Sequence, residues 1–89
     1  MTRAEVRIEN RLGLHARAAA RFVHVANRFR SRISVGRDAS SVDGKSILGL
    51  LTLAAARGTR LLLSADGDDE QHAIRELVSL IQDRFGEDE

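Results

Sequence analysis

The stretch GLHARAAARFVHVANRF, residues 13–29, is the most informative part of the chain for predicting its fold. Apolar residues recur in it at the three- and four-residue spacing of an α-helix, and basic residues occupy the opposite side. The apolar positions are Ala19, Phe22, Val23, Ala26 and Phe29, and the polar stripe holds Arg17, Arg21, His24 and Arg28. This pattern predicts an amphipathic helix of about three turns that begins at Ala16 and buries one face.

The segments on either side of this helix alternate between short strands and helices. Strands are predicted around residues 4–8, 33–35, 40–42 and 61–65, with a loop at 10–13 and turns at 36–38 and 66–69. A second helix is bracketed by Ser46 as N-cap and Gly58 as C-terminal stop. A third helix is predicted to end near Gly86 and to leave a solvated tail, residues 86–89. The elements predict one sheet covered on one side by helices.

Composition indicates one small soluble domain that spans residues 1–89. The N-terminus is charged and lacks the apolar segment of a signal peptide, no apolar run approaches membrane-spanning length, and cysteine is absent. We therefore expect a cytoplasmic protein. Residues 1–37 carry a net charge of +7 and residues 38–89 carry −6. This asymmetry points to an anionic partner on one side, unless folding mixes the two halves.

The second helix is apolar on nearly every side. A single helix in a domain this small cannot bury every face, so some of its side chains are expected to face water and to contact a partner. The alternative is a fully buried helix. The residues concerned are Ile47, Leu48, Leu50, Leu51 and Leu53.

His15 stands immediately before the first predicted helix. The first turn of a helix offers N–H groups without internal partners, and these groups favour an anion and disfavour a cation. We therefore expect a neutral imidazole, which is a nucleophile at physiological pH. Arg17 can bring a guanidinium to a phosphate. The combination fits acceptance of a phosphoryl group on a ring nitrogen, and the alternatives for His15 are a packing residue or a helix cap.

Other candidate sites in the sequence are weaker. His24 and His72 are interpreted as surface residues, and the histidine spacing predicts no metal site. The segment ASSVDGKS, residues 39–46, fits a loosened phosphate-loop pattern, but the strand and helix around it are too short for nucleotide hydrolysis. The arginine-rich first half is compatible with a small basic nucleic-acid-binding module, yet Tyr and Trp platforms are absent. No cofactor is predicted.

The chain resembles the HPr family, the histidine phosphocarriers of the bacterial phosphotransferase system. The resemblance covers essentially the whole chain, and its most specific motifs are GLHAR at 13–17 and GKSILG at 44–49. It implies an α+β open-faced β-sandwich, in which three helices cover one face of a four-stranded antiparallel sheet in the order βαββαβα.

The resemblance also implies a phosphoryl relay rather than a turnover catalyst. Phosphorylated enzyme I would donate to Nδ1 of His15, and an EIIA-type protein of a sugar or nitrogen-type branch would receive the group. Arg17 and the backbone N–H groups of Ala16, Arg17 and Ala18 would stabilise the phosphate. The residues implied to dock partners are Arg21, Ile47, Leu48 and Leu51. No membrane or nucleic acid is required, and a monomer is expected.

Two positions qualify this interpretation. Ser46 aligns with a serine that an HPr kinase/phosphorylase modifies in many family members; its alternative role is only to cap a helix. Ala18 replaces the proline most often found in the family, which leaves one more N–H donor near His15. A purely regulatory protein, phosphorylated on Ser46 with an idle His15, remains an alternative to the phosphoryl relay.

Overall fold

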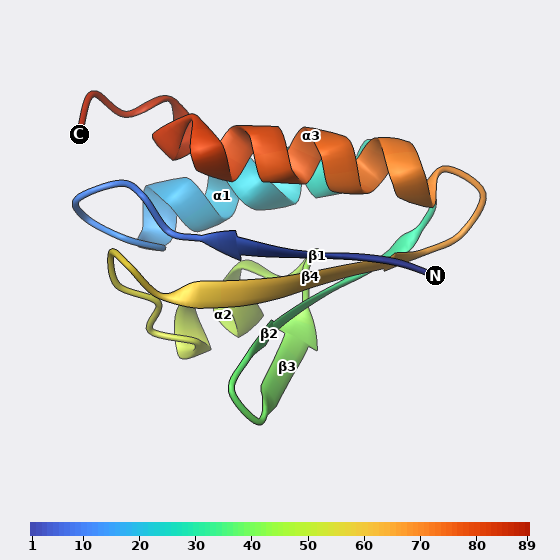
Figure 1. Cartoon of the computed structure of the whole chain (residues 1–89), viewed down its shortest axis with the longest axis horizontal. Helices are drawn as coiled ribbons and strands as arrows, with labels where there is room; N and C mark the ends of the chain where they lie inside the picture. Colours follow the sequence, from blue (N-terminus) through green and yellow to red (C-terminus); the bar gives the residue numbers. More distant parts are fainter.

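The computed structural model describes residues 1–89 and has the predicted order of elements (Figure 1). The strands are β1 (Thr2–Arg7), β2 (Arg32–Arg37), β3 (Ser40–Asp43) and β4 (Arg60–Asp66). The helices are α1 (Ala16–Ala26), α2 (Ile47–Thr52) and α3 (Glu70–Gln82), and a 3₁₀ turn, η1, covers Arg84–Gly86. The three-turn helix that begins at Ala16 is thus confirmed.

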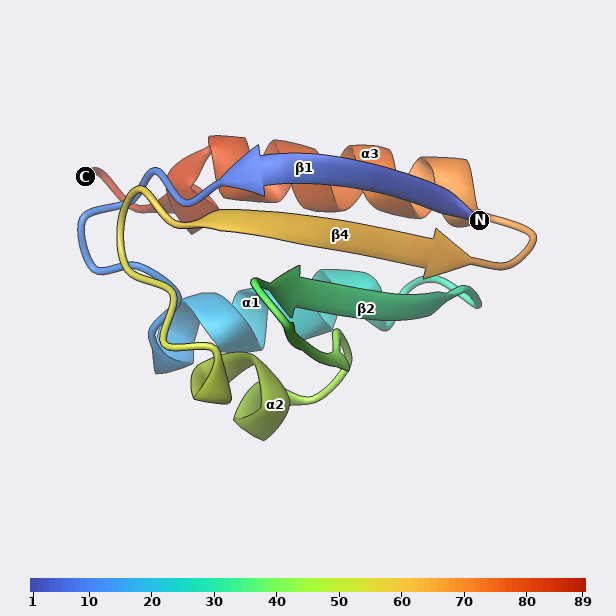
Figure 2. The same cartoon turned by 60° about the horizontal axis from the view of Figure 1, so that its bottom comes forward.

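The four strands form one antiparallel sheet in the order β1-β4-β2-β3. Val6 pairs with Leu61 and Val35 pairs with Leu63, so the alternating apolar residues of three strands share one face. The helices cover this face, and the opposite face is open, as Figure 2 shows and as the exposed Leu62 on β4 indicates. The open-faced sandwich is therefore confirmed.

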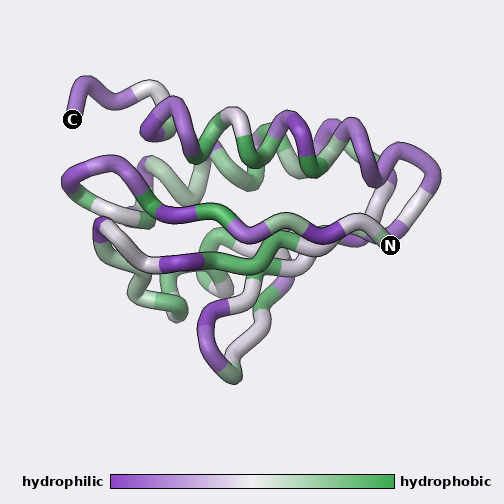
Figure 3. The backbone as a smooth tube through the Cα atoms, in the orientation of Figure 1, coloured by the Kyte–Doolittle hydropathy of each residue, from purple (hydrophilic) through white to green (hydrophobic).

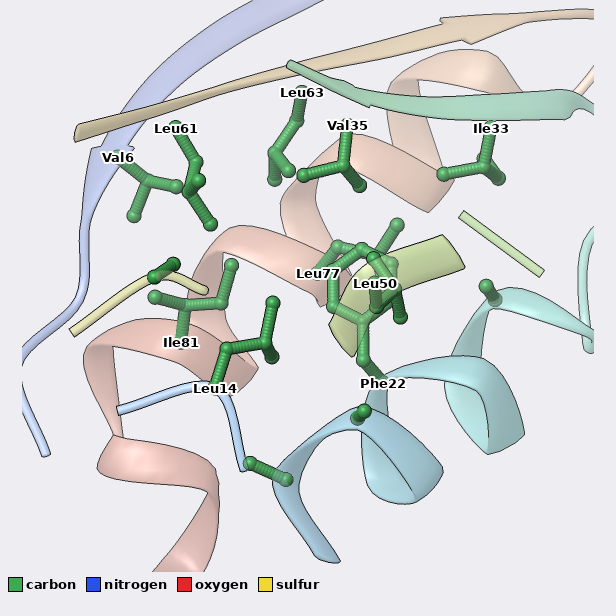
Figure 4. Packing of buried hydrophobic residues seen from close by; sticks show 14 of the residues in the cluster. Val6, Leu14, Phe22, Ile33, Val35, Leu50, Leu61, Leu63, Leu77 and Ile81 are labelled. Atoms are coloured by element: carbon green, nitrogen blue, oxygen red, sulfur yellow. The ribbon is translucent and has the colours of Figure 1, made fainter. Parts of the chain in front are cut away.

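A single connected core joins the sheet to the helices. It contains 21 buried apolar residues, and Figure 4 shows strand side chains from Val6 to Ile33 pointing toward Phe22, Leu50 and Leu77 on the three helices. Figure 3 shows how hydrophobic and hydrophilic residues alternate along β1 and α3, the pattern of elements with one buried face.

The second helix is shorter than predicted. It ends at Thr52, and Gly58 does not terminate it but lies in the loop before β4 with φ of +90°. The core explains the early stop: Leu53 and Ala55 are both buried after the helix, and the chain turns between them at Ala54, where φ is +50°. The apolar character of this segment thus arises partly from a buried turn.

The third helix also ends earlier than predicted, at Gln82. Arg84 and Phe85 both have positive φ, at +58° and +55°, in the left-handed region that costs a non-glycine residue about 1–2 kcal/mol. Burial of the Phe85 ring, which is 1% exposed, offsets this cost. The turn redirects residues 87–89 toward the loop that precedes α1, and both lie at the same end of the molecule in Figures 1 and 2.

Candidate functional site

His15 is the N-cap of α1, as the sequence predicts. Its backbone is extended, with φ of −81° and ψ of 178°, and its side chain makes no capping hydrogen bond to the helix. The imidazole is half-buried, with 27% of the side chain exposed. His15 is therefore neither a core residue nor a side-chain cap, and its ring is accessible from one side.

The loop before α1 fixes where His15 lies. Gly13 has φ of +71°, and a Cβ there would lie 2.5 Å from the carbonyl oxygen of Ala55, so only glycine fits without a shift of the backbone. Leu14 N donates to that same oxygen at 2.8 Å. Buried Asn10 donates through Nδ2 to the carbonyl of Gly13 at 2.8 Å. The backbone at the entry to α1 is thus held by the Ala55 carbonyl on one side and by the Asn10 side chain on the other.

The first turn of α1 presents three free N–H groups. Ala19 N donates to the carbonyl of His15 at 2.8 Å, the first bond of the helix, and the N–H groups of Ala16, Arg17 and Ala18 have no partner within the chain. No acidic residue lies in this turn. Unpaired donors at the positive end of a helix form a surface that favours an anion.

Arginine side chains add positive charge to this end of the molecule. Arg17 and Arg21 are exposed on α1, and the guanidinium of Arg21 donates to the carbonyl of Phe85. With Arg11 they border a surface depression of about 480 Å³ that Glu87 also lines. The basic stripe predicted from the sequence therefore faces the C-terminal tail as well as solvent.

The C-terminal tail, residues 86–89, is exposed as predicted at Gly86, Asp88 and Glu89, but the Glu87 side chain packs against the site. Nε2 of His15 lies 2.5 Å from Oε2 of Glu87, and Asn10 Nδ2 donates to Oε1 of Glu87 at 2.9 Å. Arg11 holds the end of the tail through its backbone N–H, which donates to the Glu89 carbonyl, and through a 2.8 Å ion pair with the Glu89 carboxylate. The sequence did not indicate this contact because Phe85, which anchors the tail, fits the helical pattern as part of a last turn.

The Glu87 carboxyl group has a pKa below its ordinary value of 4.5. Burial raises this pKa, but the hydrogen bonds from Asn10 and His15, together with the attraction of His15 and Arg21, outweigh the effect of burial. Glu87 is therefore ionised at neutral pH. Neither Asn10 nor Glu87 carries a periodic or motif signal in the sequence, so sequence analysis missed both.

Ser46 caps α2, as predicted: its side chain accepts a hydrogen bond from Gly49 N at 2.9 Å. Only Leu50 of this helix is fully buried, whereas Ile47 is 40% and Leu48 is 77% exposed, so the expected surplus of apolar surface is confirmed. Leu51 is half-buried against the core. Helix α2 lies alongside α1 in Figure 2.

The remaining candidate residues are not gathered into a site. His24 and His72 are both exposed, and the ring of His72 packs edge-on against Phe29 with centroids 5.0 Å apart. Lys45 Nζ donates to the Phe29 carbonyl at 2.8 Å and leads into a helix of six residues, unlike the lysine of a phosphate loop. No three His, Cys, Asp or Glu side chains cluster as metal ligands would. None of the helices has the length and apolar character needed to span a membrane.

Comparisons with known proteins agree with this geometry. A family model described as "PTS HPr component phosphorylation site" matches residues 2–83. The chain is 51% identical over 90 residues to the phosphocarrier protein HPr of Pseudomonas aeruginosa, and the alignment covers 100% of both chains.

Solved structures match over the full chain as well. The crystal structure of HPr-C-His from Thermoanaerobacter tengcongensis has a TM-score of 0.96 and 46% identity, and the match covers 100% of both chains. A second structure from that organism, described as an HPr dimer, has a TM-score of 0.78 and 47% identity, and covers 98% of this chain and 100% of that one.

Proposed function

The chain belongs to the HPr family of the phosphotransferase system, and on this premise we propose that His15 accepts a phosphoryl group from phosphorylated enzyme I and passes it to an EIIA-type protein. The observation that carries the proposal is the pairing of an accessible imidazole at the N-cap of α1 with three unpartnered N–H groups in the adjoining turn. These supply a nucleophile and a place for the anion that it acquires.

The transfer exchanges one nitrogen–phosphorus bond for another. The lone pair of a His15 ring nitrogen attacks phosphorus, and the bond to the donor's nitrogen breaks, with its electron pair returning to the donor. The N–H groups of Ala16, Arg17 and Ala18 and the guanidinium of Arg17 then stabilise the dianion on His15. The second transfer reverses these roles toward the EIIA-type protein. The chain is thus consumed and regenerated as a relay and is not a turnover catalyst.

Partner docking would use the exposed part of α2 beside the basic stripe of α1. Ile47 and Leu48 offer apolar surface with Leu51 at its edge, and Arg21 offers charge to acidic partners. We propose that the protein acts as a monomer in the cytoplasm, as family membership implies. Nucleic-acid binding is the weaker alternative, because the basic side chains near the site face a tail that carries three acids.

Ser46 is proposed as a regulatory phosphorylation site for an HPr kinase/phosphorylase. A phosphate at this N-cap would favour the helix but would add about two negative charges next to Ile47 and Leu48. An acidic partner would then be repelled from the docking surface. In the purely regulatory alternative this modification would be the only function and His15 would be idle.

The test of the relay is incubation with phosphoenolpyruvate and enzyme I. We expect one acid-labile, base-stable phosphate on the wild type and none on His15→Ala. His24→Ala, which removes an exposed histidine on the same helix, is the matched control and should be labelled like the wild type. An acid-stable label that survives in His15→Ala would contradict the relay, and normal signalling in cells by that variant would favour the regulatory alternative.

A further inference from the structure

The shortest polar contact of the His15 side chain is with the C-terminal tail. Its Nε2 atom lies 2.5 Å from Oε2 of Glu87, and its Nδ1 atom has no hydrogen-bond partner within the chain. The two side chains are 72 residues apart in sequence. The two ring nitrogens of His15 are therefore in different environments.

This contact determines which ring nitrogen carries the proton. A carboxylate can only accept hydrogen bonds, so Nε2 must be the donor. In the neutral ring, Nδ1 then has no proton and keeps its lone pair for reaction. A free imidazole in water exchanges between both tautomers, whereas the contact with Glu87 selects one of them.

Glu87 is itself held in place. Asn10, which is 0% exposed, donates to Oε1 of Glu87 and to the Gly13 carbonyl through the same amide nitrogen. Both acceptors require the amide NH₂ at that position, which fixes the orientation of Asn10. The ion pair of Arg11 with Glu89 and the buried Phe85 ring fix the tail on either side. The carboxylate is thus oriented by buried structure.

We propose that Glu87 is a positioning residue for phosphoryl transfer, which holds His15 as the Nε2–H tautomer and directs the phosphoryl group to Nδ1. The proposal rests on the proposed function of His15. When the Nδ1 lone pair bonds to phosphorus and the donor's nitrogen–phosphorus bond breaks, the imidazole gains positive charge, which it shares with Nε2–H. The Glu87 carboxylate compensates this charge, as an aspartate does for the histidine of a hydrolase triad.

The decisive variant is Glu87→Gln. An amide presents one oxygen and one NH₂, so it cannot accept from both Asn10 and His15 as the carboxylate does. Asp88→Asn is the matched control, because it removes the same charge from the next residue, which is exposed and makes no hydrogen bond or ion pair. Amide spectra of all three proteins establish that the fold is retained.

The first measurement is the protonation of each ring nitrogen, read from long-range ¹H–¹⁵N spectra of the unphosphorylated protein at a pH where the ring is neutral. The wild type and Asp88→Asn should show one tautomer, with the proton on Nε2, and Glu87→Gln should show a mixture. A mixture in the wild type, or one unchanged tautomer in Glu87→Gln, would overturn the proposal. This measurement needs no phosphoryl donor.

The second measurement is the steady-state rate of phosphorylation by enzyme I. Glu87→Gln should lower kcat about tenfold and leave KM near the wild-type value, because the change affects the imidazole and not the docking surface. Equal losses in Glu87→Gln and Asp88→Asn would overturn a specific role for Glu87. If the wild type takes no label on His15, the relay itself fails, and the ring-nitrogen spectra alone still decide whether Glu87 selects the tautomer.

Discussion

At the start of helix α3 two acidic side chains, Asp69 and Glu70, bind other parts of the chain, whereas the start of α1 has no acidic residue in its first turn and leaves three backbone N–H groups without a partner. The carboxylate of Asp69, the N-cap of α3, accepts from Arg30 N, Ser31 N and the Ser31 hydroxyl. Glu70 accepts from the Thr2 hydroxyl and pairs with the terminal ammonium group of Met1 at 3.1 Å. The two starts belong to helices of similar length but differ in what they leave available.

On the proposed function, the two helix starts have different roles, one in stability and one in phosphoryl transfer. Asp69 makes no capping bond to its own helix and instead joins α3 to the turn before β2. It therefore contributes to the tertiary structure. The start of α1 forgoes such bonds, and its unpaired donors remain ready for an external anion. If these roles are separate, a substitution at the start of α3 should change the free energy of unfolding but not the phosphorylation of His15.

The largest effect is expected at the loop that holds the start of α1. Gly13→Ala should lower the free energy of unfolding by about 3 kcal/mol, because Ala must adopt a positive φ and its Cβ meets the Ala55 carbonyl. Urea unfolding measures the loss. Gly58→Ala is the control: its φ is also positive, but no atom lies within 4 Å of the new Cβ, so about 1 kcal/mol should be lost. Equal losses would show that the Ala55 contact is unimportant.

The next largest effect is expected at the start of α3, at its N-cap Asp69. Hydrogen bonds from the Ser31 hydroxyl and from Arg30 N lower the pKa of Asp69 from 3.8 to about 2, against a smaller effect of desolvation. Because the folded pKa is the lower one, this carboxylate stabilises the fold above about pH 4, and the contribution is lost as the pH falls toward 2.

Asp69→Asn should therefore be less stable than the wild type at neutral pH, and the gap should close over that acidic range. Urea unfolding of both proteins across the range measures the gap. Glu70 and Glu87, whose pKa values are also lowered, titrate in both proteins and cancel in the difference. A difference in stability that does not change with pH would contradict the lowered pKa of Asp69 as its cause. Phosphorylation of His15 should be the same in both proteins at neutral pH.

A third helix start, that of α2, allows a smaller test. Ser46→Ala removes the hydrogen bond from Gly49 N and should cost about 1 kcal/mol, measured by urea unfolding. Ser46→Asp keeps an acceptor at the cap and should restore the stability, yet it should slow transfer to an EIIA-type protein through the added charge. Ser46→Asp with unchanged transfer would argue against regulation at this position.

The smallest effect is expected from Ala18→Pro, which restores the residue that is usual in the family. Proline removes an N–H that has no partner within the chain, so the free energy of unfolding should change by less than about 1 kcal/mol. Thermal unfolding measures this change, and the half-life of the phosphate on His15 measures the loss of one donor. A large destabilisation would indicate that the proline ring does not fit the buried position of Ala18.

The sequence predicted those features that depend on local patterns. Alternation placed Val6, Leu61 and Leu63 on the buried face of the sheet, and helical spacing placed His15 at the start of α1. Capping chemistry identified Ser46. The spacing of apolar residues along a short stretch of sequence is enough to predict which face of a strand or helix is buried.

Features that depend on contacts between distant segments were not predictable. Asp69 looks like an ordinary N-cap in the sequence, but its partners lie 38 and 39 residues away. Glu87 lies in an acidic tail, and the left-handed backbone at Arg84 and Phe85 turns that tail back to Asn10 and His15. A buried aromatic with positive φ overrides the helical pattern that continues through it, so the sequence indicated a longer helix and a free end.

The two chain ends lie at opposite ends of the molecule, one at each of the helix starts compared above (Figure 1). Met1 pairs with Glu70 at the start of α3, and residues 87–89 pack beside His15. Purification tags and fluorescent fusions are therefore not neutral additions to this protein. A fusion ahead of Met1 would remove the ammonium group that pairs with Glu70, and a fusion after Glu89 would crowd the His15 imidazole, so each would perturb a different property.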